Sequence, residues 1–168
     1  DSAHGDPAMG DLIVGSPLAL TLAMRGSVKS CLGHAGWKDD LDEAVAMARD
    51  YDPFSRALTI MFRTLPIGYG AILPDIAALR DTAEALDVAE RSGDDFALAN
   101  AQLARGALLV QQSGGDQDRG FDLLLAVRQA AEQQRFTVSA VWFVDIMLAK
   151  EKGRSGDMGG AIELSRAV

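Results

Sequence analysis

The second half of the sequence, residues 96–168, repeats one arrangement: a helix with a small residue near its centre, a glycine-containing turn and a second helix. The first of these helices carries small or apolar residues at helical spacing, which places them on one helix face: Ala99, Leu103, Gly106 and Val110. Gly114 and Gly115 end that helix, and another follows with its own apolar stripe. The arrangement begins again at Val138 and turns at Gly156. The pattern predicts stacked helical hairpins.

The first half of the chain carries the same kind of signal. Ser16-Pro17 and Asp52-Pro53 are each typical of a helix N-cap followed by proline at the first helical position. Residues 1–15 are predicted to form an irregular lead-in, and residues 16–168 a single helical-repeat domain. We therefore expect an all-α protein with eight helices and no sheet, paired into hairpins at about 16–50, 53–92, 95–136 and 138–168.

The spacing of the small residues gives the repeat its period. Gly26 and Gly106 lie 80 residues apart, two periods of about 40, and Ala149 follows 43 residues later. A period near 40 with two helices per unit is typical of an α-solenoid of about four hairpins. Because a mid-helix glycine costs about 1 kcal/mol against alanine, Gly26 indicates a close helix crossing. A four-helix bundle with additional helices is the alternative fold.

Charge and composition exclude several partners. The chain has 24 acidic and 16 basic residues, and its net charge of −8 repels nucleic acid. No apolar run reaches the roughly 20 residues that span a bilayer, so no membrane contact is expected. The single Cys31 forms no internal disulfide and fits a reducing, cytoplasmic compartment. The polar start without an initiator methionine suggests a piece of a longer protein.

Residues for metal or phosphate chemistry are sparse. His4 and His34 have one cysteine between them and give no zinc-ligand spacing, so no metal or cofactor is expected. Residues 33–38 lack the spacing of a phosphate-binding loop and join two helices. The acids beginning at Asp116 are spaced like a calcium loop, but Val127 stands where the closing glutamate belongs. No catalytic residue is predicted, and we expect this piece not to be an enzyme.

Three arginines share one place in the predicted repeat. Arg25 and Arg105 each precede a central glycine, and Arg63 lies 38 residues after the first and 42 before the second. Stacked hairpins would align them in a column that receives an acidic partner or phosphate. In the alternative we favour, each pairs with an acid of a neighbouring helix. Asp145, a charge in an otherwise apolar helix, is the expected partner of Arg105.

Several short motifs resemble the helical-repeat region of actinobacterial multidomain signalling proteins. They are Gly15-Ser-Pro-Leu-Ala19, Arg25-Gly26, Gly36-Trp-Lys-Asp-Asp-Leu41, Ala46-Met-Ala-Arg49, Asp52-Pro53 and Ala89-Glu-Arg-Ser-Gly-Asp-Asp95. Ala149, Gly156, Asp157 and Ala161 also follow the spacing of a tetratricopeptide repeat, although the earlier hairpins have longer turns. The resemblance implies a parent in which an adenylyl cyclase domain and an ATPase module precede the repeats. It carries no catalytic residue onto this chain.

Two functions of different classes follow from these observations. The first is a non-catalytic scaffold that binds a protein, either the parent's own catalytic and ATPase domains or another chain. The second is a small-molecule effector sensor with a pocket lined by Trp142, Phe143 and Tyr69. Because the last helix stops at Val168, the stack ends without a polar cap. We expect this end to be covered by a second copy, as in a homodimer, or by neighbouring molecules, or to fray.

Overall fold

The structure is a computed structural model that describes residues 15–112, 114–133 and 141–166. Over these ranges the chain forms eight α-helices and no strand, which confirms the all-α prediction. The predicted lead-in, apart from Gly15, lies outside the described residues, and so does the boundary expected between the last two hairpins. The helices are α1 (Pro17–Cys31), α2 (Trp37–Arg49), α3 (Pro53–Gly68), α4 (Ile76–Ser92), α5 (Asp95–Leu109), α6 (Gly115–Glu132), α7 (Val141–Arg154) and α8 (Met158–Arg166).

Local sequence signals set several of the helix ends. Ser16 caps α1 and Asp52 caps α3, each accepting a hydrogen bond from a backbone N–H three residues further on. Gly93 ends α4 in the left-handed conformation, with φ of 71°, and Asp94 caps α5. The starts at Ser16 and Asp52 are where the sequence predicts them, because each cap depends on contacts within a few residues.

Two further helix ends depend on residues of the adjoining loop. Helix α3 continues past Pro66 and ends at Gly68. Proline removes only one N–H donor, and its own carbonyl, in the last turn, accepts a hydrogen bond from the following loop: Ala71 donates its N–H to the Pro66 carbonyl at 2.8 Å. Helix α4 begins at Ile76, two residues after Pro74, because Asp75 provides the N-cap.

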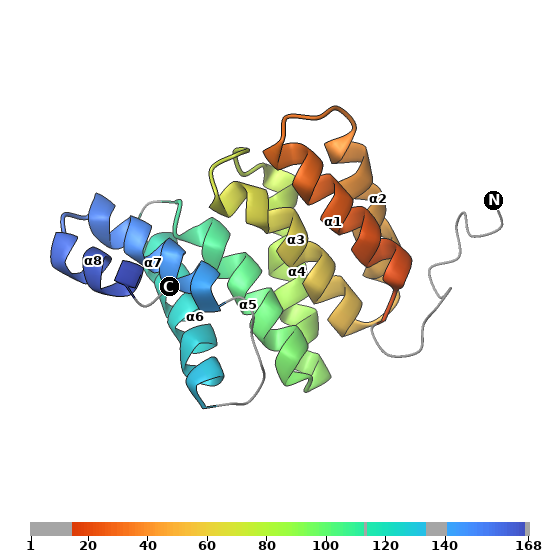
Figure 1. Ribbon diagram of the computed structural model, residues 1–168. Helices are drawn as coiled ribbons and strands as arrows, with labels where there is room; N and C mark the ends of the chain where they lie inside the picture. Colours follow the sequence, from red (N-terminus) through yellow and green to blue (C-terminus); the bar gives the residue numbers. More distant parts are fainter. Residues whose placement is uncertain (1–14, 113, 134–140, 167–168) are drawn as a thin grey trace.

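Successive hairpins lie side by side from one end of the molecule to the other (Figure 1). The first helix of each hairpin packs on the first helix of the next, α1 on α3 and α3 on α5. The last hairpin departs from this order, because α7 packs against α5 over a much shorter stretch and the backbones of α6 and α8 do not pack together. The tetratricopeptide-like solenoid register stays a prediction.

Glycines mark two close helix crossings. A Cβ on Gly26 would lie 2.8 Å from the Leu41 side chain, where α1 crosses α2. A Cβ on Gly106 would lie 2.9 Å from the Leu124 side chain, where α5 crosses α6. Both distances are too short for carbon atoms in contact, so the missing side chain is what allows the helices to approach. The close crossing predicted at Gly26 is confirmed.

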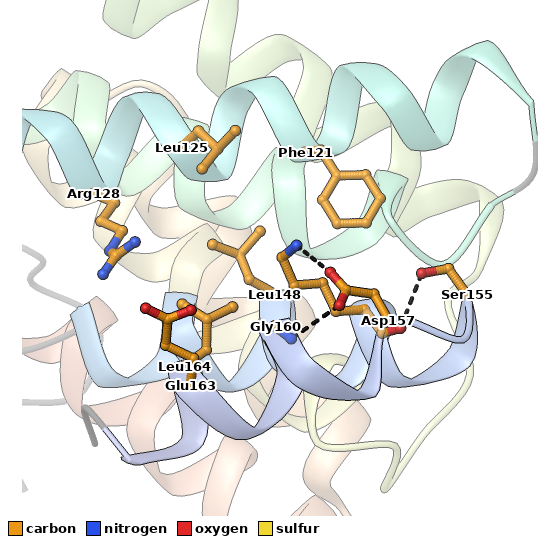
Figure 2. Close-up of a pocket in the computed structure, with 10 residues that line it drawn as sticks. Phe121, Leu125, Arg128, Leu148, Ser155, Asp157, Gly160, Glu163 and Leu164 are labelled. Atoms are coloured by element: carbon orange, nitrogen blue, oxygen red, sulfur yellow. Dashed lines mark hydrogen bonds and ion pairs between the residues drawn. The ribbon is translucent and has the colours of Figure 1, made fainter.

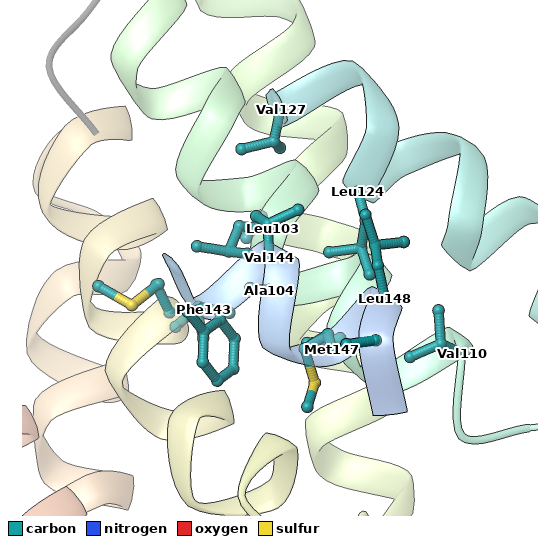
Figure 3. Close-up of a cluster of buried hydrophobic side chains, with 14 of the residues drawn as sticks. Leu103, Ala104, Val110, Leu124, Val127, Phe143, Val144, Met147 and Leu148 are labelled. Atoms are coloured by element: carbon teal, nitrogen blue, oxygen red, sulfur yellow. The ribbon is translucent and has the colours of Figure 1, made fainter. Parts of the chain in front are cut away.

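The largest hydrophobic cluster joins α7 to the helices before it. Figure 3 shows side chains from α5, α6 and α7 meeting around Leu103, Leu124 and Phe143. Phe143 is fully buried, and its ring lies where a Cβ on Gly68 of α3 would be. Burying such a ring stabilises the fold by about 2–3 kcal/mol. The last hairpin is therefore attached chiefly through the apolar face of α7.

Candidate functional site

Arg25 of the predicted arginine column is bound to the helix next to it. Its Nε and Nη2 donate to the two carboxylate oxygens of Asp40 on α2 at 2.9 and 2.7 Å. Lys29 lies 2.8 Å from the same carboxylate. The arginine hydrogen bond, helped by Lys29, lowers the pKa of Asp40 to about 2 against the opposing effect of burial. The Arg25 side chain remains 55% exposed.

The other two arginines reach back to the preceding hairpin. Arg63 on α3 is buried and donates to Asp42 on α2 at 2.7 Å. Arg105 on α5 donates to the Leu79 carbonyl at 2.7 Å and to the Thr82 hydroxyl at 3.2 Å, both on α4. Burial lowers the pKa of Arg105. All three arginines are thus engaged within the chain, and their role in binding a partner stays a prediction.

The expected pair between Arg105 and Asp145 is wrong. Asp145 is buried on α7, as its apolar surroundings suggest, but Nε of Arg128 on α6 lies 3.2 Å from its Oδ1. The expectation assumed that α7 repeats the packing of α5. Because α7 packs more against α6 than against α5, its carboxylate faces a different arginine.

The three aromatic residues proposed for a small-molecule pocket do come together. Tyr69 stacks on Trp142 at a ring-centroid distance of 6.4 Å and meets Phe143 edge-on at 5.3 Å. However, Phe143 is fully buried and packs into the space beside Gly68. The three rings fill this region and leave Tyr69 and Trp142 as an exposed aromatic pair.

The largest hollow described on the molecule is a groove of about 610 Å³ between α6 and α8. Phe121 and Leu125 form the α6 wall, Gly160 and Leu164 form the α8 wall, and Leu148 of α7 lies between them (Figure 2). The groove exists because α6 and α8 do not pack together, while α7 holds both. It combines an apolar floor with a charged rim.

Charged residues of the rim are mostly paired with each other. Lys152 lies 2.7 Å from Asp157, which also accepts the Gly160 N–H at 2.9 Å and so caps α8. The lysine, with help from that N–H, lowers the pKa of Asp157. Arg128 faces Asp145, whereas Glu163, also on the rim, has no ion-pair partner in the part of the chain that the structure describes.

Sequence reasoning did not identify this groove. The sequence contained one signal. Helix α6 carries Phe121 and Leu125 beside its buried stripe of Leu124 and Val127, so its apolar face is wider than packing against a single neighbouring helix requires. The second wall had no comparable signal. The depth of a groove depends on how two helices distant in sequence are placed.

α8 also presents an apolar outer surface. Met158 and Ile162, one turn apart, are both exposed on it. Whether a second copy or another molecule covers this end, or whether the end frays, stays a prediction.

The residues described hold no group of three or more histidine, cysteine, aspartate or glutamate side chains placed to bind a metal ion. Among them, too, no helix combines the length and apolar character needed to cross a membrane. Comparison of the chain with protein-family models, curated proteins and solved structures gives no match. The resemblance described above therefore rests on its motifs alone.

Proposed function

We propose that this chain is a non-catalytic protein-interaction module that holds an apolar segment of a partner protein in the groove between α6 and α8. The observation that carries the proposal is the groove itself, with Phe121, Leu125, Leu148 and Leu164 lining one hollow. Leu125 is 43% exposed, an apolar side chain in a concave setting where a partner would remove it from water.

The shape of the groove favours a macromolecule. Small-molecule pockets bury most of the ligand surface, whereas this groove lies open between two helices and has exposed residues such as Leu125 and Glu163 on its walls. Laying an apolar face into a groove between helices is a common mode of peptide recognition. In a parent of the kind the motifs resemble, the bound segment belongs to the catalytic or ATPase modules, and binding regulates them.

Effector sensing is the second candidate, favoured by one observation. The groove volume of about 610 Å³ falls within the range of roughly 300–1,000 Å³ seen for small-ligand sites. A metabolite present at a hundred times its dissociation constant would add about 2.7 kcal/mol of stability. Thermal-shift screening of the chain against metabolites measures this effect directly.

The protein-binding proposal is tested with a displayed library of amphipathic helical peptides carrying leucine at every third or fourth position. Selected peptides are measured by fluorescence anisotropy against the wild-type chain, Leu125→Glu and Ile76→Glu. Ile76 is also an exposed apolar helix residue, but it lies outside the groove at the start of α4, and so it is a matched control. Only Leu125→Glu should weaken binding, by more than about tenfold, because it places a charge on the apolar wall.

Two results would overturn the proposal: no library peptide binds the wild-type chain, or both variants bind the selected peptides equally well. Thermal unfolding of each variant checks that the fold is retained. Co-purification with the parent's catalytic modules, lost in Leu125→Glu, tests the regulatory assignment.

A further inference from the structure

Each helix around the groove contributes residues one turn apart. These pairs are Phe121 and Leu125 on α6, Leu148 and Lys152 on α7, and Gly160 and Leu164 on α8. Side chains four residues apart form ridges along a helix, and such ridges fit between those of another helix. The geometry suits a helix more than an extended strand, which needs an exposed sheet edge for its backbone.

The charged residues that line the groove are two cations and two carboxylates, but further carboxylates beside Arg128 give the surroundings a small excess of negative charge. Lys152 is neutralised by Asp157, and Arg128 has two carboxylates near it, Asp145 at 3.2 Å and Glu132 at 3.6 Å. Glu163 adds a further negative charge, beside the Arg128 end of the groove in Figure 2. Arg166 lies one turn along α8 from Glu163, but no ion pair joins them. The excess of carboxylates here has the same sign as the net charge of −8 of the whole chain.

Building on the proposed function, we infer that the occupant of this groove is a basic amphipathic helix of a partner protein. Its apolar face packs on Phe121, Leu125 and Leu148, and a lysine or arginine beside that face lies next to Glu163. Glu163 is then the residue that sets the charge preference. Burying the apolar face supplies most of the affinity, while the negative charge of Glu163 selects the partner and speeds its association.

A matched pair of peptides tests this inference. Both carry the leucine pattern of a peptide selected from the helical library, and they differ only in having lysine or glutamate beside the apolar face. Anisotropy is measured with the wild-type chain, Glu163→Gln, Glu163→Lys and Glu90→Gln. Glu90 is an exposed glutamate on α4, away from the groove, and so it controls for the loss of one charge.

The wild-type chain should bind the lysine peptide at least about fivefold more tightly than the glutamate peptide, and Glu163→Gln should reduce this preference roughly threefold, as expected for an exposed charge pair. Glu163→Lys should reverse the preference, and Glu90→Gln should leave it unchanged. The preference should shrink at high salt, where exposed charges are screened.

Failure of the inference is distinguishable from failure of the proposed function. If both peptides bind equally and both depend on Leu125, the groove binds apolar segments but the basic partner is wrong. If sedimentation shows a wild-type dimer that Leu125→Glu converts to monomer, the occupant is a second copy and the inference is also wrong. If neither peptide binds, the proposed function fails.

Discussion

Hairpins α5–α6 and α7–α8 are neighbours in the chain but are packed in opposite ways. In α5–α6, glycines on both helices let the backbones approach: a Cβ on Gly120 would lie 2.6 Å from the Val110 nitrogen. In α7–α8, a Cβ on Gly153 would meet only the Ala161 Cβ, at 3.9 Å, an ordinary contact. The α5–α6 crossing therefore has no space for an added methyl group. The α7–α8 hairpin has such space at Gly153, and a groove lies beside it.

This difference shows how a helical stack separates stability from binding. The α5–α6 crossing buries Leu103, Leu109 and Leu124 almost completely. The last hairpin is held by one face of α7, through Phe143 and the Arg128–Asp145 pair, and leaves apolar residues at solvent on the groove. The loosely packed end is the part of the molecule that has surface available to a partner.

The largest expected effect comes from filling the tight crossing. Gly120→Ala places a methyl group against the backbone of α5, which cannot move as a flexible side chain can, so we expect a loss of about 3 kcal/mol. Chemical denaturation measures the change in unfolding free energy. An unchanged midpoint would show that the two hairpins do not differ in the way described.

Removing the link between α6 and α7 should affect the last hairpin selectively. Arg128→Ala leaves the buried Asp145 carboxylate without its counter-charge, and we expect a cost of about 2 kcal/mol because Arg128 is itself partly exposed. Hydrogen exchange should rise across α7 and α8 and stay constant in α1–α4. Equal increases in all helices would mean that the last hairpin opens only with the whole molecule.

Acid should weaken the first hairpin through Asp40. Its pKa is lowered to about 2 in the fold, so its carboxylate stabilises the protein above the ordinary pKa near 4, and this contribution is lost as the pH falls towards 2. Because Arg25 is half exposed, we expect only about 1 kcal/mol. In Asp40→Asn, the part of the pH dependence between 4 and 2 that comes from this residue should disappear. Denaturation at a series of pH values tests this.

The smallest expected effect has the opposite sign. Gly153→Ala in α7 makes only an ordinary contact with the Ala161 Cβ and improves helix propensity, so it should stabilise the last hairpin by up to about 1 kcal/mol. Thermal unfolding and hydrogen exchange of α7 measure the gain. A destabilised variant would indicate that α7–α8 is packed as tightly as α5–α6.

The helix ends and the close crossing could be predicted from the sequence because they depend on local chemistry. The caps at Ser16 and Asp52, the stop at Gly93 and the close crossing at Gly26 follow from neighbouring residues or from the cost of a mid-helix glycine. All were predictable because a single residue type is favoured in each situation. The eight-helix, all-α fold follows from the same signals repeated along the chain.

The partner of Asp145 and the groove could not be predicted from the sequence, because both depend on long-range packing. The partner of Asp145 depends on where α7 docks, and α7 docks partly on Gly68, which lies two hairpins earlier. The repeat period predicted an α7 placed like α5, and that single assumption gave the wrong arginine. The groove was missed for the same reason, because its walls come from helices that do not pack together.

The packing of Phe143 into the space beside Gly68 affects how the molecule unfolds on heating. A hairpin attached chiefly through one face of α7 and one partly exposed ion pair has a lower opening free energy than the stack beside it, and such units open first on heating. We therefore expect the groove to lose its shape a few degrees below the temperature at which the remaining helices melt. A bound partner would close that interval, because it binds only the docked hairpin. The working temperature range of this surface is then set by Gly68, a residue that lies outside the groove.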